Sequence, residues 1–354
     1  MFRPSVFVSV TDLAPVLSRV KLFDARYDIQ QPETYGIGEY RKAHAAGAMF
    51  ASVDRDLSAP AGKAGRHPLP DPEAFVAWCL HSGIDHTPVV CYDDMGGGMG
   101  AARLWWMLDA LGVEAYVLDG GFQAYLAAGL PTASGEPTPP TPSAQWPFER
   151  TFKKAVSLHE ISPNARVVDA RIELRFNSTV RPYTMDTVPG HIAGAVNVPF
   201  LSNLDAEKKL RPVETLRGQM SSAIGGTDAT THIFTCASGV TACMNIAVAR
   251  HLQFGAPYLY CGAWSEYAGV HAVALRRAAV DAHGMCFEML SKSLHLQPKV
   301  GASNCAITVD SVKTAFAAAD EHVHKALSHM HVGEEARVFF RGGRMVHIKT
   351  EPLS

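Results

Sequence analysis

The sequence lacks an excess of charge of either sign, and this absence narrows the classes of partner. It has 32 Lys and Arg residues against 34 Asp and Glu residues, a formal net charge of -2 over 354 residues. Such a balance provides no field that would attract a nucleic acid or an anionic lipid surface. With 47% hydrophobic and 19% charged residues, the composition is that of an ordinary globular protein. We therefore expect neither a nucleic acid nor a membrane as partner.

Long apolar runs and paired cysteines are missing as well. No apolar stretch reaches the roughly 18 residues of a membrane-spanning helix, and the first ten residues do not have the pattern of a targeting helix. The seven cysteines are odd in number and lack the spacing of a disulfide framework or a zinc site. We expect reduced thiols in the cytoplasm, with no metal and no cofactor.

What the sequence does contain is one unit twice. Four short landmarks of the first half recur in the same order and at nearly constant spacing in the second half. The pairs are Leu22–Arg26 with Val167–Arg171, His44–Ala48 with His191–Ala195, Val89–Asp93 with His232–Cys236, and Asp119–Tyr125 with Cys261–Tyr267. Six prolines between Pro131 and Pro147 indicate a semi-rigid connection. We predict domains at 1–135 and 151–283 and a Pro-rich linker at 136–150.

Each copy alternates short apolar strands with helical patterns. Val89–Tyr92 and Ile233–Thr235 are typical strands, and the amphipathic stretches Ala101–Leu111 and Thr241–Leu252 follow them after Gly-containing turns. Strand, turn and helix in repetition predict an α/β fold, in which helices flank a parallel sheet. The site of such a fold lies at the carboxyl ends of the strands, where Asp93 and Cys236 are expected.

The last segment, 284–354, belongs to neither copy. We predict a strand at Cys305–Val309, a helix at Ser311–His329 and a hairpin of Ala336–Phe340 with Met345–Lys349. This is a small α+β domain. Its histidines do not suggest a metal site, because His322 and His324 are two residues apart and do not share a helix face.

Cys236 is the candidate nucleophile. A thiol attacks as its thiolate, and the residues after Cys236 turn into a helix whose first N–H groups have no partner within that helix. These amides and the helix dipole form a setting for an anion. Gly239 permits the tight turn, and Ser238 and Thr241 add hydroxyl groups. For the other six cysteines, packing as small buried side chains is the expected state.

The run Thr235–Cys243, the His-x-x-Gly-Ala element of each half, Trp105-Trp106 and the duplicated layout resemble a known family. It is the tandem rhodanese-domain family of 3-mercaptopyruvate sulfurtransferases, and the resemblance covers about residues 5 to 270. The resemblance implies two rhodanese-like domains, of which the first is a non-catalytic twin with Asp93 at the nucleophile position. The additional C-terminal domain resembles that of the kinetoplastid members.

The resemblance also implies the roles of individual residues. A serine of the cysteine loop works in this family with a histidine and an aspartate of the first domain, and the matching residues are Ser238, His67 and Asp54. Arg175 matches the first substrate-binding arginine. Thr184 stands at the position of the second, for which Arg181 is the nearby substitute. The loop residues expected to contact substrate are Ala237, Gly239, Val240 and Thr241.

The expected reaction is sulfur transfer from 3-mercaptopyruvate to an acceptor thiol such as thioredoxin, or to cyanide, through a persulfide on Cys236. The nearest alternative is a thiosulfate sulfurtransferase, whose relatives carry Arg and Lys directly after the cysteine, where Ala237 and Ser238 stand here. A further alternative is a non-catalytic sulfur-carrier or interaction module. A cysteine phosphatase is excluded because its Cys-x5-Arg loop requires arginine where Ala242 stands.

Overall fold

The computed structural model describes residues 5–162, 165–177, 191–192, 194–225 and 231–271, and the backbone of later strands between 273 and 350. The chain divides into two compact units. The first comprises Met1–Phe176 and Gly194–Glu266, and the second comprises Asn177–Ala193 and Tyr267–Ser354. Both copies of the repeat lie almost entirely in the first unit.

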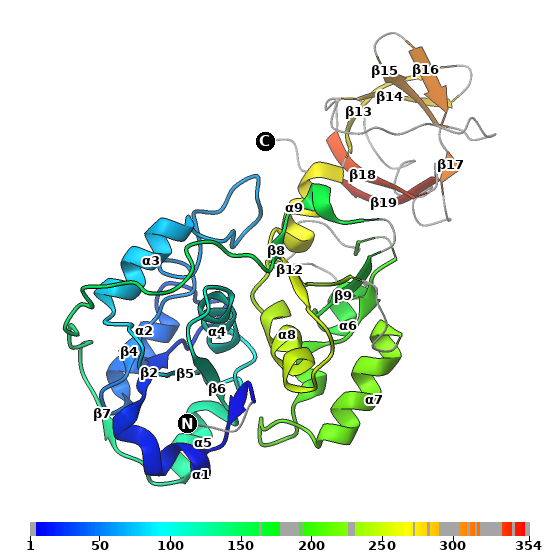
Figure 1. The fold of residues 1–354 in the computed structure, drawn as a ribbon. Coiled ribbons are helices and arrows are strands. Elements are labelled where there is room, and N and C mark those ends of the chain that lie inside the picture. Colours follow the sequence, from blue (N-terminus) through cyan, green and yellow to red (C-terminus); the bar gives the residue numbers. More distant parts are fainter. Residues whose placement is uncertain are drawn as a thin grey trace. The chain divides into compact units, whose positions relative to one another are not determined.

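The first copy is a five-stranded parallel sheet with helices around it (Figure 1). Its strand order is β1-β6-β5-β2-β4. The strands are β1 (Phe7–Val8), β2 (Lys21–Asp24), β4 (Met49–Phe50), β5 (Val89–Tyr92) and β6 (Ala115–Leu118). The helices are α1 (Val10–Leu13), α2 (Tyr35–Lys42), α3 (Pro72–His81), α4 (Gly100–Ala110) and α5 (Gly121–Ala127). A separate pair, β3 (His44–Ala45) with β7 (Thr132–Ala133), is antiparallel.

The second copy repeats this sheet, with order β10-β9-β11-β12-β8 and all strands parallel. The strands are β8 (Ala155–Val156), β9 (Arg166–Asp169), β10 (Val196–Asn197), β11 (His232–Thr235) and β12 (Tyr258–Tyr260). The helices are α6 (Glu173–Phe176), α7 (Val213–Ile224), α8 (Ala242–His251) and α9 (Ala263–His271). The predicted duplication, the parallel sheets and the strand-to-helix units at β5-α4 and β11-α8 are confirmed.

A buried ion pair ends the equivalent strands β2 and β9. Arg26 donates from Nε and Nη2 to Asp24 at 3.0 and 2.6 Å, and Arg171 does the same to Asp169 at 3.1 and 2.7 Å. Each guanidinium also lies over an aromatic ring, Phe122 in the first copy and a tryptophan in the second. The Asp-Ala-Arg landmark of the sequence is therefore one repeated structural device, which satisfies a buried carboxylate with two charge-assisted hydrogen bonds.

The two copies share one hydrophobic core. Helix α4 is apolar on nearly every side, and all its residues except Asp109 are buried, as expected of a helix enclosed by protein. It packs against α8 of the second copy, and the two helices lie side by side in Figure 1. Trp105 and Trp106 are among the largest fully buried side chains. This packing brings the loops of the two copies together.

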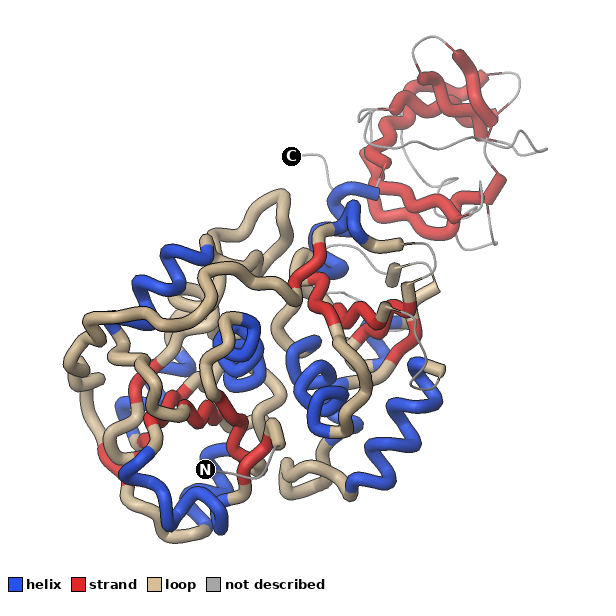
Figure 2. Tube along the Cα trace, in the orientation of Figure 1, coloured by secondary structure: helices blue, strands red, loops and turns tan. Residues whose placement is uncertain are grey.

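The C-terminal segment forms a seven-stranded sheet of order β16-β15-β14-β13-β18-β19-β17. Its strands are drawn in red in Figure 2. Its strands are β13 (Val273–Asp281), β14 (Gly284–Met289), β15 (Cys305–Val309), β16 (Val312–Ala315), β17 (Ala317–Ala318), β18 (Glu335–Arg341) and β19 (Arg344–Thr350). The predicted strand at Cys305–Val309 and the hairpin, now β18 and β19, are confirmed.

One expectation for this region is wrong. The helix predicted at Ser311–His329 is replaced in its described part by β16 and β17, because Val312–Ala315 pairs with β15. Strand β13, which precedes the predicted boundary at 283/284, pairs with β14 and β18 of the C-terminal sheet.

Among the residues that the structure describes, none of the helices is both long enough and apolar enough to span a lipid bilayer.

Candidate active site

Cys236 directly follows β11, and its side chain is 2% exposed. The loop after it curls so that the backbone N–H of Gly239 donates to Cys236 Sγ at 3.1 Å. Gly239 has φ +79°, and a Cβ there would lie 2.6 Å from the carbonyl oxygen of Cys261. Glycine is therefore required at this position. Helix α8 begins at Ala242, directly after the loop.

A second segment of the same copy holds the loop from the side. Trp264 N–H donates to the carbonyl of Cys236, and Ser265 N–H donates to the carbonyl of Ala237, both at 3.0 Å. This segment runs from the end of β12 into α9. The Gly-Ala-Trp landmark therefore supports the cysteine loop through its backbone amides.

Three predicted residues from the two copies form a hydrogen-bonded chain. His67 Nδ1 lies 2.7 Å from Ser238 Oγ, and His67 Nε2 lies 3.0 Å from Asp54 Oδ1. His67 and Ser238 are buried, with 4% and 3% exposure. If the proton is on Nε2, where the carboxylate accepts it, Nδ1 is left to accept the serine hydroxyl proton. The arrangement can carry a proton from Ser238 to His67.

The surroundings of His67 favour its neutral form. Burial lowers the pKa of His67 below its usual value, and this effect outweighs the opposing hydrogen bond to Asp54. A neutral imidazole is the form that accepts a proton. The loop that carries His67 is tied to the second copy, because Arg66 N–H donates to Ser265 Oγ at 3.0 Å.

Three further residues of this neighbourhood were not predicted from the sequence. Tyr27 places its hydroxyl 3.2 Å from His67 Nε2. Arg103 of α4 and Cys261 of the segment after β12 lie behind the cysteine loop, with Arg103 Nη1 3.0 Å from Cys261 Sγ. Arg103 carried a signal in the sequence, as a lone cation in an otherwise apolar stretch, and Cys261 is the first residue of the repeated landmark Cys261–Tyr267.

The remaining predicted residues lie in the cysteine loop, on α6 or outside the described part of the chain. Ala237 and Val240 are buried in the loop, and Thr241 precedes α8 with an intermediate exposure. Arg175 lies on α6, also with intermediate exposure. Arg181 and Thr184 lie outside the described residues.

The equivalent loop of the first copy is filled by its own carboxylate. Asp93 follows β5, is fully buried, and accepts hydrogen bonds from the backbone N–H groups of Met95, Gly97, Met99 and Ala101 at 2.7 to 3.2 Å. Burial nevertheless raises the pKa of Asp93 to about 6, with the neighbouring Asp94 contributing. The loop thus has the amide donors of an anion site, and the side chain of Asp93 occupies them.

The other described cysteines have the surroundings of packed side chains. Cys79, Cys91 and Cys243 are fully buried, and burial raises the pKa of each of these thiols. Cysteine in such surroundings is unreactive. Within the described part of the chain, no group of three or more His, Cys, Asp or Glu side chains has the arrangement of a metal site.

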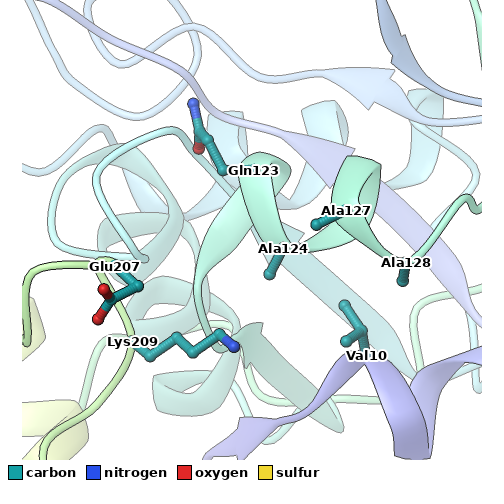
Figure 3. Close-up of a pocket in the computed structure, with 7 residues that line it drawn as sticks. All are labelled: Val10, Gln123, Ala124, Ala127, Ala128, Glu207 and Lys209. Atoms are coloured by element: carbon teal, nitrogen blue, oxygen red, sulfur yellow. The ribbon is translucent and has the colours of Figure 1, made fainter.

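A pocket of about 410 Å³ lies away from these residues, along α5 (Figure 3). Alanines of α5 and Val10 line it, with Glu207 and Lys209 of the second copy at one side. None of the predicted site residues contributes to it.

Comparison with known proteins gives two family matches. Residues 11–128 and 153–269 match the rhodanese-like domain, and residues 285–353 match a domain of unknown function, DUF1930. A solved structure described as 3-mercaptopyruvate sulfurtransferase from Leishmania major superposes with a TM-score of 0.73 at 38% identity, covering 99% of this chain and 98% of that one.

Two curated relatives match the tandem region. A "Probable 3-mercaptopyruvate sulfurtransferase" of Pseudomonas aeruginosa is 38% identical over 273 residues, 73% of this chain and 94% of the relative. A "Putative thiosulfate sulfurtransferase" of Mycobacterium tuberculosis is 32% identical over 277 residues, 75% of this chain and 94% of the relative.

Proposed function

The chain belongs to the family of rhodanese-like domains, and from this premise we propose that it transfers sulfur from 3-mercaptopyruvate to a thiol acceptor through a persulfide on Cys236. One observation carries the proposal. The chain Asp54, His67 and Ser238 ends in the same loop as Cys236, so that a proton relay and a thiol lie together. The relatives named for 3-mercaptopyruvate support the choice of substrate.

In the first half-reaction, Ser238 Oγ accepts the proton of the substrate thiol as its own proton passes to His67 Nδ1. The Cys236 thiolate attacks the substrate sulfur, a new S–S bond forms, and the C–S bond of the substrate breaks. The electron pair of that bond leaves with pyruvate as its enolate, which takes the proton back from His67. The N–H of Gly239 and the start of α8 stabilise the negative charge on the Cys236 persulfide.

In the proposed substrate complex, the uncharged cysteine loop contacts the reacting sulfur and an arginine binds the carboxylate. The side chains next to Cys236 are uncharged, so that the loop offers no cation to an inorganic dianion. A mercapto acid carries its charge on a carboxylate away from the reacting sulfur, and a guanidinium binds a carboxylate through paired hydrogen bonds. Arg175 fills this role in the proposal, with Arg181 as the second arginine.

In the second half-reaction an acceptor thiolate attacks the outer sulfur of the persulfide and releases the Cys236 thiolate. Reduced thioredoxin fits this step as a protein thiol, and cyanide would serve as a small acceptor. Because the cycle starts from a reduced Cys236 and consumes acceptor thiols, we place the protein in a reducing compartment, the cytoplasm.

The test is mass spectrometry of the protein after exposure to 3-mercaptopyruvate without an acceptor. We expect the protein to gain one sulfur atom, to release one equivalent of pyruvate, and to carry the extra sulfur on the peptide that contains Cys236. Added thioredoxin should remove that sulfur. Cys236→Ser is the matched control and should gain no sulfur; if it does, another nucleophile acts.

The relative named for thiosulfate supports one alternative, in which thiosulfate is the sulfur donor. The ratio of kcat/KM for 3-mercaptopyruvate to that for thiosulfate decides between the two substrates. We expect a ratio well above one, because Ala237 and Ser238 provide no cation for thiosulfate. Introducing charge with Ala237→Arg and Ser238→Lys should move the ratio toward thiosulfate, and a ratio below one in the wild type would overturn the proposed substrate.

A further inference from the structure

Arg103 is a fully buried guanidinium at the junction of the two copies. Its side chain is 0% exposed although it lies on the apolar helix α4. Guanidinium stays protonated in proteins, so the charge is permanent, and burying an unbalanced charge is costly. The surroundings of this side chain must therefore compensate for its positive charge.

The hydrogen-bond partners of Arg103 are neutral on both sides. Nη2 donates to the carbonyls of Leu57 and His67 at 3.0 and 3.2 Å, in the loop that carries the proton relay. Nη1 donates to the carbonyl of Gly239 at 3.3 Å and to Cys261 Sγ at 3.0 Å, in the second copy. Among the described residues, no Asp or Glu oxygen pairs with Arg103. The positive charge thus lacks a carboxylate counter-ion.

Cys261 is a neutral partner in this arrangement. Its thiol lies 3.2 Å from the carbonyl oxygen of His67 and is placed to donate to it, while its sulfur accepts from Arg103. A protonated thiol makes both contacts, whereas a thiolate would face the carbonyl oxygen without a proton between them. The repeat places Asp119 at the equivalent position of the first copy, so the second copy has a thiol beside Arg103 at the position where the first copy has a carboxylate.

Gly239 connects Arg103 to the nucleophile. Its carbonyl accepts from Arg103 Nη1, and its N–H donates to Cys236 Sγ. In the proposed reaction, a single residue, Gly239, therefore separates this cation from the negative charge of the Cys236 thiolate and then of its persulfide.

We propose that Arg103 is a positioning residue of the non-catalytic copy that supplies the counter-charge for the Cys236 thiolate from behind the loop, while it binds the His67 and Gly239 carbonyls together. This inference rests on the proposed function. It assigns the first copy a part in catalysis beyond the relay residues. It also reconciles an anionic nucleophile with an uncharged loop, because the cation lies on the buried side of Gly239.

The test uses the full-length protein without substrate, so that it does not depend on the reaction. The rate of Cys236 alkylation by iodoacetamide is measured against pH, with Cys236→Ser as background. Among the described residues, the other groups that titrate or carry charge near Cys236 and Arg103 are Tyr27, Asp54, Arg66 and His67 of the first copy and Cys243 and Cys261 of the second. Each variant is therefore compared with a matched partner.

Two variants at Cys261 keep Arg103 and test whether a negative charge at position 261 neutralises it. Cys261→Asp supplies a carboxylate, and we expect alkylation near neutral pH to slow by roughly ten-fold with the profile moved to higher pH. The asparagine of Cys261→Asn has nearly the same shape as the aspartate but no charge, so this variant should leave the pH profile of Cys236 alkylation unchanged. An unchanged profile in Cys261→Asp, or faster alkylation in Cys261→Asn, would overturn the inference, since Cys261 would then already carry the negative charge.

Two variants at Arg103 test the charge itself. Arg103→Met should slow alkylation by a similar factor, whereas Arg103→Lys, which keeps the charge, should restore most of the rate. Equal pH profiles of Cys236 alkylation for the wild type and for a folded Arg103→Met protein would also overturn the inference about Arg103. The outcome is separate from the proposed function, because wild-type protein that gains no sulfur from 3-mercaptopyruvate would overturn the function while leaving these alkylation profiles intact.

Discussion

The two loops at the ends of β5 and β11 occupy the same place in the repeated fold, but one encloses a carboxylate and the other a thiol. In the first copy, four backbone amides are used by the carboxylate of Asp93. In the second copy, the amide of Gly239 is directed at the thiol of Cys236, and the relay of His67 and Ser238 lies beside it. A loop whose donors are already satisfied has nothing to offer a substrate. The difference shows how one duplicated scaffold yields a structural copy and a reactive copy.

The largest effect should come from making the second loop like the first. In Cys236→Asp the new carboxylate should take the loop amides and leave no nucleophile, and kcat/KM for sulfur transfer should fall about 10⁴-fold or more. Steady-state pyruvate release measures this. The reciprocal Asp93→Cys should gain no activity, because among the residues that the structure describes no histidine and serine relay lies beside that loop. Sulfur loading on residue 93 would contradict this account of the first copy.

The buried ion pairs should respond alike in both copies. Asp24→Asn and Asp169→Asn each remove the carboxylate charge that a buried arginine pairs with, and each should lower the free energy of unfolding by about 3–5 kcal/mol. Urea denaturation at neutral pH measures both variants. If one variant lost much less than the other, the two Asp-Ala-Arg devices would not be energetically equivalent despite their matching geometry.

Changes to the relay of Asp54, His67 and Ser238 should lower the rate of the reaction at Cys236. His67→Gln should lower kcat by about 10²–10³-fold with a small change in KM, and Ser238→Ala should lower it similarly. Because the pKa of His67 is lowered by burial, the base stays neutral below the usual imidazole titration. Wild-type kcat/KM should therefore hold to lower pH than for an ordinary histidine and then fall as His67 is protonated. A decline already at the ordinary histidine range would contradict this.

The smallest effect concerns the pH dependence of the first loop. The pKa of Asp93 in the folded protein is raised to about 6 from its ordinary value near 3.8, so the folded state binds the proton more tightly. The stability that this provides is fully present below about pH 3.8 and is lost as pH rises through about 6, a change of up to about 3 kcal/mol. Asp93→Asn does not titrate there and is the control. Urea denaturation across this pH range should show wild type losing stability relative to the variant.

The repeat, the parallel sheets and the cysteine loop could be predicted from sequence because they depend on local patterns. Val89–Tyr92 and His232–Thr235 are short β-rich runs, and each is followed by a turn and a helix with its own apolar periodicity. The helix predicted at Ser311–His329 failed at Val312–Ala315, where pairing with β15 overrides the helical pattern. Strand pairing depends on distant partners, which a local pattern does not contain.

By itself, the sequence determined that the fold is duplicated, that Asp93 and Cys236 end equivalent strands, and that the loop after Cys236 is uncharged. It also pointed to His67 and Asp54 through a resemblance. Only the tertiary structure decided that His67 lies 2.7 Å from Ser238 and that Arg103 contacts Cys261. These contacts join residues more than 150 positions apart, and they exist because the apolar helices α4 and α8 bury each other and bring the loops of two copies together.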